Sequence, residues 1–217
     1  MIYIQKSTPP KKFQEFKQKP QAHYDSMPAD VKSALRQSLL EEQGYLCAYC
    51  MRRIHNNPQE VKIEHYEPRN SQNELEYSNL LAVCKGNSNG NQFGHQHCDT
   101  KKGDKNLHIN PQNIDHIRCI SYRSDGTIYA NDNDEFNNDL NLTLNLNDEH
   151  GYLKSSRKVA LDRLKDKIHS EYKDKTACRS FIEKSLQFYL SKDQNGKRQQ
   201  YCGIIIDYLI KRLKKWS

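Results

Sequence analysis

Hydrophobic positions along the chain follow helical spacing near both ends and strand-like alternation in the middle. Residues 28–43 place four aliphatic side chains on one stripe, at the intervals that an amphipathic helix requires. Pro28 suits the first turn of such a helix, and Gly44 is a typical residue to stop it. The stripe consists of Val31, Leu35, Leu39 and Leu40. The pattern therefore predicts a helix that ends just before Cys47.

Helices are also predicted at both ends of the chain. Residues 1–20 contain Pro9-Pro10, which predicts an extended arm on the surface of the rest, with one short helix carrying Phe13 and Phe16. The last third of the chain predicts three further helices, because its apolar residues recur at helical intervals. These helices span residues 153–175, 177–191 and 199–216.

The middle of the chain has the pattern of two strands followed by a helix. Residues 61–65 alternate and predict a strand, which Pro68 ends. A short apolar run at residues 80–83 predicts its partner strand, and residues 98–104 predict the start of a helix.

A second hairpin is predicted beyond this helix. Residues 120–129 have the pattern of two strands with Asp125-Gly126 as the turn. Leucines then alternate with polar residues over residues 140–146, and alternation is typical of an extended edge rather than a helix. These leucines are Leu140, Leu142, Leu144 and Leu146.

The composition predicts a modest core. Of the 217 residues 35% are hydrophobic, and the mean hydropathy is −1.01, so a bound metal is one expected source of additional stability. No apolar run is long enough for a transmembrane helix, and the start of the chain lacks the apolar segment of a signal peptide. We therefore expect a cytoplasmic protein without a membrane partner. Seven cysteines, an odd number, disfavour a disulfide framework in a reducing compartment.

Positive charge is concentrated in the last third. Residues 151–217 carry 17 Lys and Arg against 7 Asp and Glu, whereas residues 47–150 carry 10 against 15. A basic region of this kind is typical of a surface that meets nucleic acid or an acidic protein, although solvated helix faces have the same composition. The acidic middle indicates that bulk electrostatics does not hold the substrate at the core.

Four of the seven cysteines are candidate zinc ligands. The C-x-x-C turn at residues 47–50 brings two thiolates together as a tetrahedral zinc site needs, although a redox pair has the same spacing. Two later cysteines complete the set, and either His95 or His97 in the loop between them is an alternative ligand. Free buried thiols are the remaining interpretation, since buried cysteine is common. The four cysteines are Cys47, Cys50, Cys84 and Cys98.

The order of these motifs resembles that of the HNH endonucleases of the ββα-metal type. The shared order is C-x-x-C, acid-His at Glu64-His65, Asn79 before an apolar run and a cysteine, and Cys98-Asp99-x-x-Lys102. The wider pattern is similar to the Septu PtuB proteins, which also occur with retron reverse transcriptases, and it extends over residues 1–165. It rests on Ile4-Gln5-Lys6 near Pro9-Pro10, residues 41–50 and 97–104, Leu144-Asn145-Leu146-Asn147, Leu153 and Arg157.

The resemblance implies an α+β fold with a zinc-stabilised ββα-metal (HNH) nuclease core and helical N-terminal and C-terminal flanks. We expect an N-terminal arm with helices at residues 1–46, the zinc-containing nuclease core at 47–110, a β-hairpin and extended loop at 111–150, and a basic helical region at 151–217. Glu64 stands where many HNH nucleases have Asp.

The resemblance also implies roles for individual residues in phosphodiester hydrolysis. Neutral imidazole accepts a proton from water, so His65 is the candidate general base. Glu64 and Asp99 are the candidate ligands of a catalytic divalent cation, Mg²⁺ or Mn²⁺, because hard cations prefer oxygen. Many HNH nucleases have Asn or His in place of Asp99, which leaves the metal preference open.

Three further residues have implied roles around this site. Asn79 matches the middle letter of the HNH name and is implied to brace the loop that aims His65, although asparagine is also common in plain turns. Lys101 and Lys102 are candidate contacts to the substrate phosphate, or alternatively a solvated helix end.

By the same resemblance, the chain is implied to be the nuclease subunit of an anti-phage system. Its implied partners are a nucleic acid substrate, DNA or RNA including tRNA, a PtuA-like ATPase, and in retron versions a reverse transcriptase with its RNA–DNA product. Residues 1–20 and the helices after residue 153 are the predicted docking surface. The rival interpretation is a non-catalytic zinc module that binds nucleic acid or scaffolds a complex. An intact Glu64-His65 pair and Asp99 favour the enzyme, because a scaffold needs neither.

Overall fold

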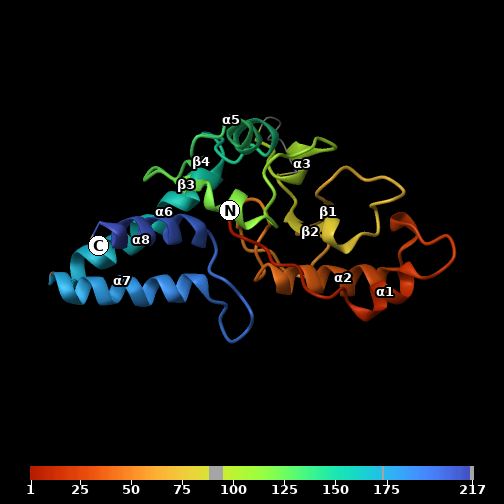
Figure 1. Cartoon of the computed structure of the whole chain (residues 1–217), viewed down its shortest axis with the longest axis horizontal. Helices are drawn as coiled ribbons and strands as arrows, with labels where there is room; N and C mark the ends of the chain where they lie inside the picture. Colours follow the sequence, from red (N-terminus) through yellow and green to blue (C-terminus); the bar gives the residue numbers. More distant parts are fainter. Residues whose placement is uncertain (88–94, 173, 216–217) are drawn as a thin grey trace.

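Helices occupy both ends of the molecule, and two small antiparallel sheets lie between them (Figure 1). The computed structural model describes residues 1–87, 95–172 and 174–215. The elements are α1 (Lys11–Lys17), α2 (Ala29–Glu42), β1 (Val61–His65), β2 (Leu80–Cys84), α3 (Asp99–Lys102), α4 (Ile114–Arg118), β3 (Ile120–Tyr122), β4 (Ile128–Ala130), α5 (Asp134–Asn138), α6 (Tyr152–Glu171), α7 (Lys175–Leu190) and α8 (Cys202–Lys214). The α+β class is as predicted.

Helix α2 has the predicted bounds to within one residue and packs against β2. Its four predicted core residues are buried. The side chain of Gln43, directly after the helix, is also buried and binds the free edge of β2. Its amide nitrogen donates to the Ala82 carbonyl at 2.7 Å, and its amide oxygen accepts from the Ala82 N–H at 2.8 Å. Gln43 thus satisfies the buried Ala82 N–H, whereas the Ala82 carbonyl also accepts from the Ala48 N–H at 3.1 Å.

Strands β1 and β2 form an antiparallel pair, and α3 follows them in the chain. Val61 faces Cys84 at one end of the pair, and His65 faces Leu80 at the other. The order strand, strand, helix is the one predicted. The helix is short, because Gly103 ends it after four residues.

The second hairpin, β3 and β4, forms where the sequence predicts it, with Ile120 opposite Ala130. The predicted extended edge at residues 140–146 is wrong, because Asp139–Thr143 forms a π-helical turn. Leu140 and Leu144 are fully buried and lie four residues apart. A spacing of four residues places two side chains on one face of a helical turn as well as on one face of a strand, so the leucine pattern fits both. The Asp139 carboxylate fixes this turn by accepting from the backbone N–H groups of His108 and Ile109.

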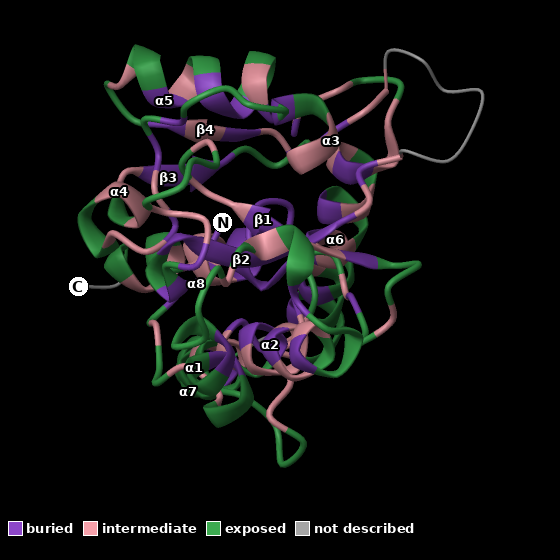
Figure 2. Cartoon of the chain, turned by 90° about the vertical axis from the view of Figure 1, so that its right-hand side faces the viewer, coloured by how far each residue is buried: buried purple, intermediate pink, exposed green. Residues whose placement is uncertain are grey.

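Helices α6, α7 and α8 form the end of the molecule opposite α1 and α2, and their bounds are close to the predicted ones. Helix α7 packs along α8, and α8 contacts both α6 and β3. One buried cluster contains residues from the N-terminal arm, both sheets and α6 to α8, as the purple ribbon in Figure 2 shows. Met1 and Ile4 belong to this cluster, so the expected surface arm is partly buried. No helix among the described residues has the length and apolar character needed to cross a membrane.

Candidate functional site

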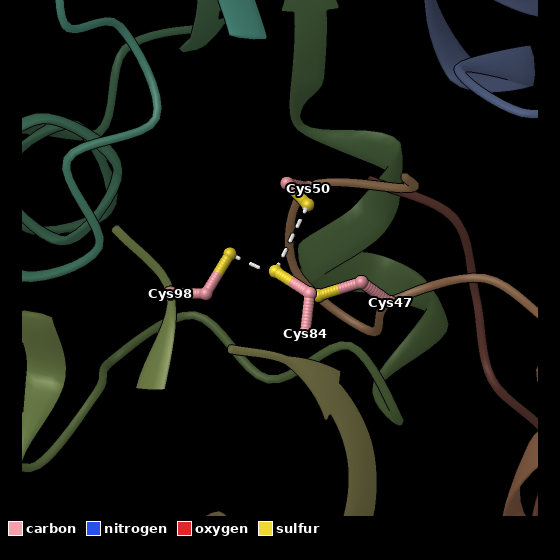
Figure 3. A group of neighbouring side chains, drawn as sticks. All are labelled: Cys47, Cys50, Cys84 and Cys98. Carbon is pink, nitrogen blue, oxygen red and sulfur yellow. Dashed lines mark hydrogen bonds between the residues drawn. The ribbon is translucent and has the colours of Figure 1, made fainter. Parts of the chain in front are cut away.

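The four predicted zinc ligands lie together in the structure. The sulfur atoms of Cys47, Cys50, Cys84 and Cys98 are all buried and lie within 4.8 Å of one another (Figure 3). Two sulfur pairs are 3.8 Å apart, Cys47 with Cys98 and Cys50 with Cys84. Four sulfurs on a tetrahedral zinc with bonds of about 2.3 Å would be separated by about 3.8 Å. The cluster therefore fits a zinc ion and can bind one.

The sulfur separations exclude disulfide bonds, which need about 2.05 Å, and all seven cysteines are free thiols. The backbone conformation around the cluster helps to direct the four sulfur atoms toward one another. The turn after Cys47 closes through the Met51 N–H, which donates to the Cys47 carbonyl at 3.1 Å. Cys98 has a positive φ of 55° just before α3. The strained conformation of Cys98 is consistent with a site whose ligands restrain the chain.

His97 and His95 lie beside the cluster but not in the four-sulfur group. His97 is buried, and its Nδ1 lies 3.1 Å from the Cys98 sulfur while its Nε2 lies 3.1 Å from the Tyr152 hydroxyl. His95 instead pairs with Asp148 at 2.6 Å. Four sulfurs already complete a tetrahedral set, so His97 is placed to donate an N–H to a ligand sulfur rather than to replace it.

Glu64 and Asp99 lie side by side between β1 and α3. Glu64 is buried on β1, where its carboxylate pairs with the Lys102 ammonium at 2.8 Å and accepts from the Tyr49 hydroxyl at 3.3 Å. Asp99 pairs with the Lys62 ammonium at 2.7 Å. The two carboxyl groups are close enough for each to shift the pKa of the other. Two oxygen ligands are therefore close together, at the junction of the hairpin and the helix.

Burial and the neighbouring Asp99 carboxylate raise the pKa of Glu64 to about 9. Burial also opposes the ionisation of Asp99, but hydrogen bonds with Glu64 and Lys62 outweigh it and hold the pKa of Asp99 below its usual range. The raised pKa of Glu64 reflects, besides burial, repulsion between the two neighbouring carboxylates, and a divalent cation bound to both would relieve that repulsion.

His65 ends β1 and is half-buried. Its Nε2 lies 3.0 Å from the Glu74 carbonyl, and its ring packs edge-on against Tyr24 at 4.7 Å between centroids. A carbonyl accepts only, so the ring proton resides on Nε2 and leaves the lone pair on Nδ1. No hydrogen bond from the described residues reaches Nδ1. Burial lowers the pKa of His65, which keeps the ring neutral near neutral pH.

Asn79 is buried directly before β2, and its side chain binds both backbone groups of Glu67. The Glu67 N–H donates to Oδ1 at 2.8 Å, and Nδ2 donates to the Glu67 carbonyl at 3.1 Å. Glu67 lies two residues beyond His65, so this contact restrains the chain on leaving β1.

The two predicted phosphate contacts differ in exposure. Lys101 is exposed on α3. Lys102 is buried, and besides Glu64 it contacts the His65 carbonyl at 3.2 Å. Lys102 is thus occupied by Glu64 in the interior, whereas Lys101 is accessible, and contact of either with a phosphate stays a prediction.

Two contacts of the carboxylate pair lie outside the sequence prediction. Lys62 is two residues before Glu64, and the alternation of β1 places both on one face, so the strand pattern contained this information. Tyr49 lies inside the C-x-x-C turn, and its fully buried hydroxyl is fixed by the turn geometry. No sequence pattern identifies that contact.

No family model matches the chain. The chain is similar to a protein of Escherichia coli named "Retron Ec83 putative HNH endonuclease", with 41% identity over 86 residues, covering 33% of this chain and 33% of that protein. The aligned part thus spans about a third of the relative. This match supports a relationship to the HNH nucleases. A mixed α+β fold with a four-cysteine cluster fits a zinc-bearing, HNH-like nuclease.

Proposed function

We propose that this protein is a metal-dependent HNH endonuclease that hydrolyses phosphodiester bonds in nucleic acid. The observation that carries the proposal is the grouping at the end of β1. His65, with its Nδ1 lone pair available, directly follows Glu64 in β1, and the Glu64 carboxylate lies close to that of Asp99. The partial similarity to a retron protein supports the same class.

Each residue has one role in the proposed reaction. His65 takes the proton of the attacking water on Nδ1, while the Glu74 carbonyl holds the ring in that tautomer. Glu64 and Asp99 would hold Mg²⁺ or Mn²⁺, which when bound neutralises charge on the phosphate and the leaving oxygen. Because the protein offers two carboxylates there, water and phosphate oxygens would fill the remaining positions, as is usual for Mg²⁺.

Nicking of plasmid DNA and of structured RNA by the purified protein tests this proposal. We expect cleavage that requires Mg²⁺ or Mn²⁺ and that His65→Ala reduces at least about a thousandfold, which combines the loss of general base catalysis with misplacement of water. His55→Ala is the matched control, because His55 is exposed and its ring pairs with the nearby Glu60. Equal rates for His65→Ala and the parent protein would refute the assignment.

The rival function, a zinc module that binds nucleic acid without cleaving it, predicts a different outcome of the same experiment. The Lys62 and Lys102 ammonium groups on the two carboxylates favour it, since they already neutralise the site. Binding of nucleic acid without any metal-dependent nicking, both by the protein alone and together with a PtuA-like ATPase, would favour the rival function.

We further propose that the protein acts in anti-phage defence with a PtuA-like ATPase. An apolar groove of about 600 Å³ between the N-terminal arm, α4, β3 and α8 supports a docking role. Four of its lining residues are large exposed apolar side chains, and exposed patches of this kind are typical of interfaces. They are Tyr3, Ile114, Leu190 and Ile210.

The charges around this groove favour an acidic partner segment. Its lining includes Arg118, Arg198, Lys211 and Lys214 but only one acid, Asp207. Six of its lining residues are isoleucines and two are tyrosines, so its lining is more aliphatic than a nucleic acid surface, which combines cations with stacking aromatics. We therefore assign the groove to an apolar segment of the ATPase that is flanked by Asp or Glu.

Capture of the purified ATPase by single variants tests the groove. Ile210→Glu should weaken capture of the ATPase by about tenfold or more, because it places a charge among the apolar residues that line the groove. Leu142→Glu is the matched control, since Leu142 is equally apolar, 65% exposed and outside the groove. Undiminished capture by Ile210→Glu would refute this docking site, and a loss of nucleic acid binding instead would assign the groove to the substrate.

A further inference from the structure

A second depression lies directly beyond His65 in the chain. Its volume is about 540 Å³, and one wall consists of Tyr66, Glu67 and the turn that follows them. Glu67 is two residues from His65, so their Cα atoms are at most about 7.6 Å apart. The depression is therefore adjacent to the proposed site of hydrolysis.

Both walls of this depression are fixed by internal hydrogen bonds. The Asn70 side-chain oxygen accepts from the Gln72 and Asn73 N–H groups, at 2.8 and 3.1 Å. On the opposite wall, the Asn110 side-chain oxygen accepts from the Gln112 N–H at 2.8 Å. The Tyr66 hydroxyl joins the two walls by donating to the Leu107 carbonyl at 2.9 Å. A site built in this way needs little reorganisation when a ligand enters.

The same hydrogen bonds leave a set of donors available to a ligand. The oxygens of Asn70 and Asn110 are used internally, whereas their amide nitrogens donate to no atom of the described residues. The Asn110 N–H donates to His116 Nδ1 at 3.1 Å, which places the ring proton of His116 on Nε2. Asn106 is exposed and lines the same wall.

The chemistry of this lining selects against a phosphate. None of its residues is lysine or arginine, and its one carboxylate, Glu67, would repel a phosphate. Amide groups, an imidazole and a phenol ring instead match a flat, neutral ligand with both donors and acceptors on its edge. Asparagine pairs with base edges, and aromatic rings stack on bases that have left a helix.

We propose that this depression, lined by Tyr66, Glu67, Asn70, Asn110 and His116, binds an unpaired nucleobase of the substrate, next to the phosphate that is cleaved. This inference rests on the proposed nuclease function. A base still inside a duplex is stacked on its neighbours, so the substrate presents a single-stranded or extruded nucleotide here. The pocket thereby contributes a preference for the base beside the cut.

Nucleotide binding followed by NMR on ¹⁵N-labelled full-length protein tests the pocket without any cleavage. The probes are the four ribonucleoside 5′-monophosphates, their 2′-deoxy forms, and ribose 5-phosphate, which lacks a base. We expect saturable shifts of the Asn70 and Asn110 side-chain amides that differ between bases and that ribose 5-phosphate does not produce. The ribose and deoxyribose series distinguish an RNA from a DNA base.

Asn110→Asp is the decisive variant, because it keeps the oxygen that accepts from Gln112 and removes only the outward amide donor. It should weaken binding of the preferred nucleotide about tenfold, as expected for one hydrogen bond and an added charge. Asn195→Asp, in an exposed loop between α7 and α8, is the matched control. Equal shifts with ribose 5-phosphate, or unchanged affinity in Asn110→Asp, would overturn the inference.

Failure of the nuclease proposal gives a different result. His65→Ala should retain nucleotide binding in the pocket whether or not it stops cleavage. Binding of a base by a parent protein that shows no cleavage would therefore support the pocket and refute the nuclease function. The opposite result is cleavage that depends on His65 while Asn110→Asp changes neither its rate nor the base preferred at the cut. That result would support the nuclease function and refute the pocket.

Discussion

Two side chains hold the chain between β1 and β2, residues 66–79, close to the proposed general base. Asn79 holds the backbone of Glu67, and His65 binds the carbonyl of Glu74. The first contact restrains the loop, and the second orients the imidazole. Asn79 thus acts as a positioning residue in the proposed mechanism, because it contacts the backbone that carries His65 rather than the substrate.

Asn79→Ala should therefore lower the rate of cleavage by about ten- to a hundredfold, since small misplacements of catalytic groups have costs of this size. Asn79→Asp should recover part of the rate, because it keeps the oxygen that accepts from the Glu67 N–H. Initial rates at saturating metal measure both effects, and zinc content verifies that the fold is intact. A parent-like rate for Asn79→Ala would contradict the bracing role.

Lys62 provides a second prediction for a single residue. Its ammonium pairs with the carboxylate of Asp99, which is proposed to bind a cation. Removing this charge in Lys62→Ala should tighten the binding of Mn²⁺ by about three- to tenfold, a modest change because Lys62 is partly exposed and screened. Calorimetric titration with Mn²⁺ measures the affinity. Lys105→Ala, an exposed lysine beyond α3, is the control, and equal affinities in both variants would show that Lys62 does not compete.

Among the elements of the fold, those with a strong local pattern could be predicted from the sequence. Helix α2 and strands β1 and β2 are such elements, because the residues of each follow one period or form one short apolar run. The segment 140–146 was not predictable in this way, because Leu140 and Leu144 satisfy both periods and tertiary hydrogen bonds to Asp139 decide between them. The burial of Lys102 likewise depends on Glu64, a partner 38 positions away in the sequence.

The hairpin, the C-x-x-C turn and the residue before α3 each contribute to the four-cysteine cluster, so a bound zinc would join all three segments. Cys98→Ser should lose zinc and unfold the core, since metal-linked folding energies in zinc peptides are roughly 10–16 kcal/mol. Elemental analysis and circular dichroism measure the two effects. Cys119→Ser is the control, because Cys119 is outside the cluster and partly exposed. A folded parent protein that contains no zinc would refute this prediction.

Over the whole molecule, the basic helices are part of the core rather than a detachable tail. The Tyr201 N–H donates to the Met51 carbonyl at 3.1 Å, next to the C-x-x-C turn, and Gly203 packs against Met51 so closely that a β-carbon would lie 2.9 Å from its side chain. Removing everything after residue 152 would expose this surface. Point variants such as Ile210→Glu therefore test docking more cleanly than a truncation.

Arg157 connects α6 to the rest of the molecule and is 1% exposed. Its Nε donates to the Gly126 carbonyl at 2.6 Å in the β3–β4 turn, and one terminal nitrogen donates to the Leu146 carbonyl at 2.8 Å. No carboxylate pairs with it among the contacts of the described residues, and burial lowers its pKa. Its stabilising effect thus comes from satisfying buried carbonyls that have no access to water.

Arg157→Leu should reduce the free energy of unfolding by roughly 3–5 kcal/mol, because it leaves two buried carbonyl groups without donors and each such group costs about 1–3 kcal/mol. Urea unfolding with zinc bound measures the change, and a shift of the midpoint without a change in slope would identify it as a loss of stability. Arg163→Leu is the matched control on the same helix, since Arg163 is exposed. If the two variants unfold at the same urea concentration, the Arg157 hydrogen bonds do not hold α6 to the hairpin.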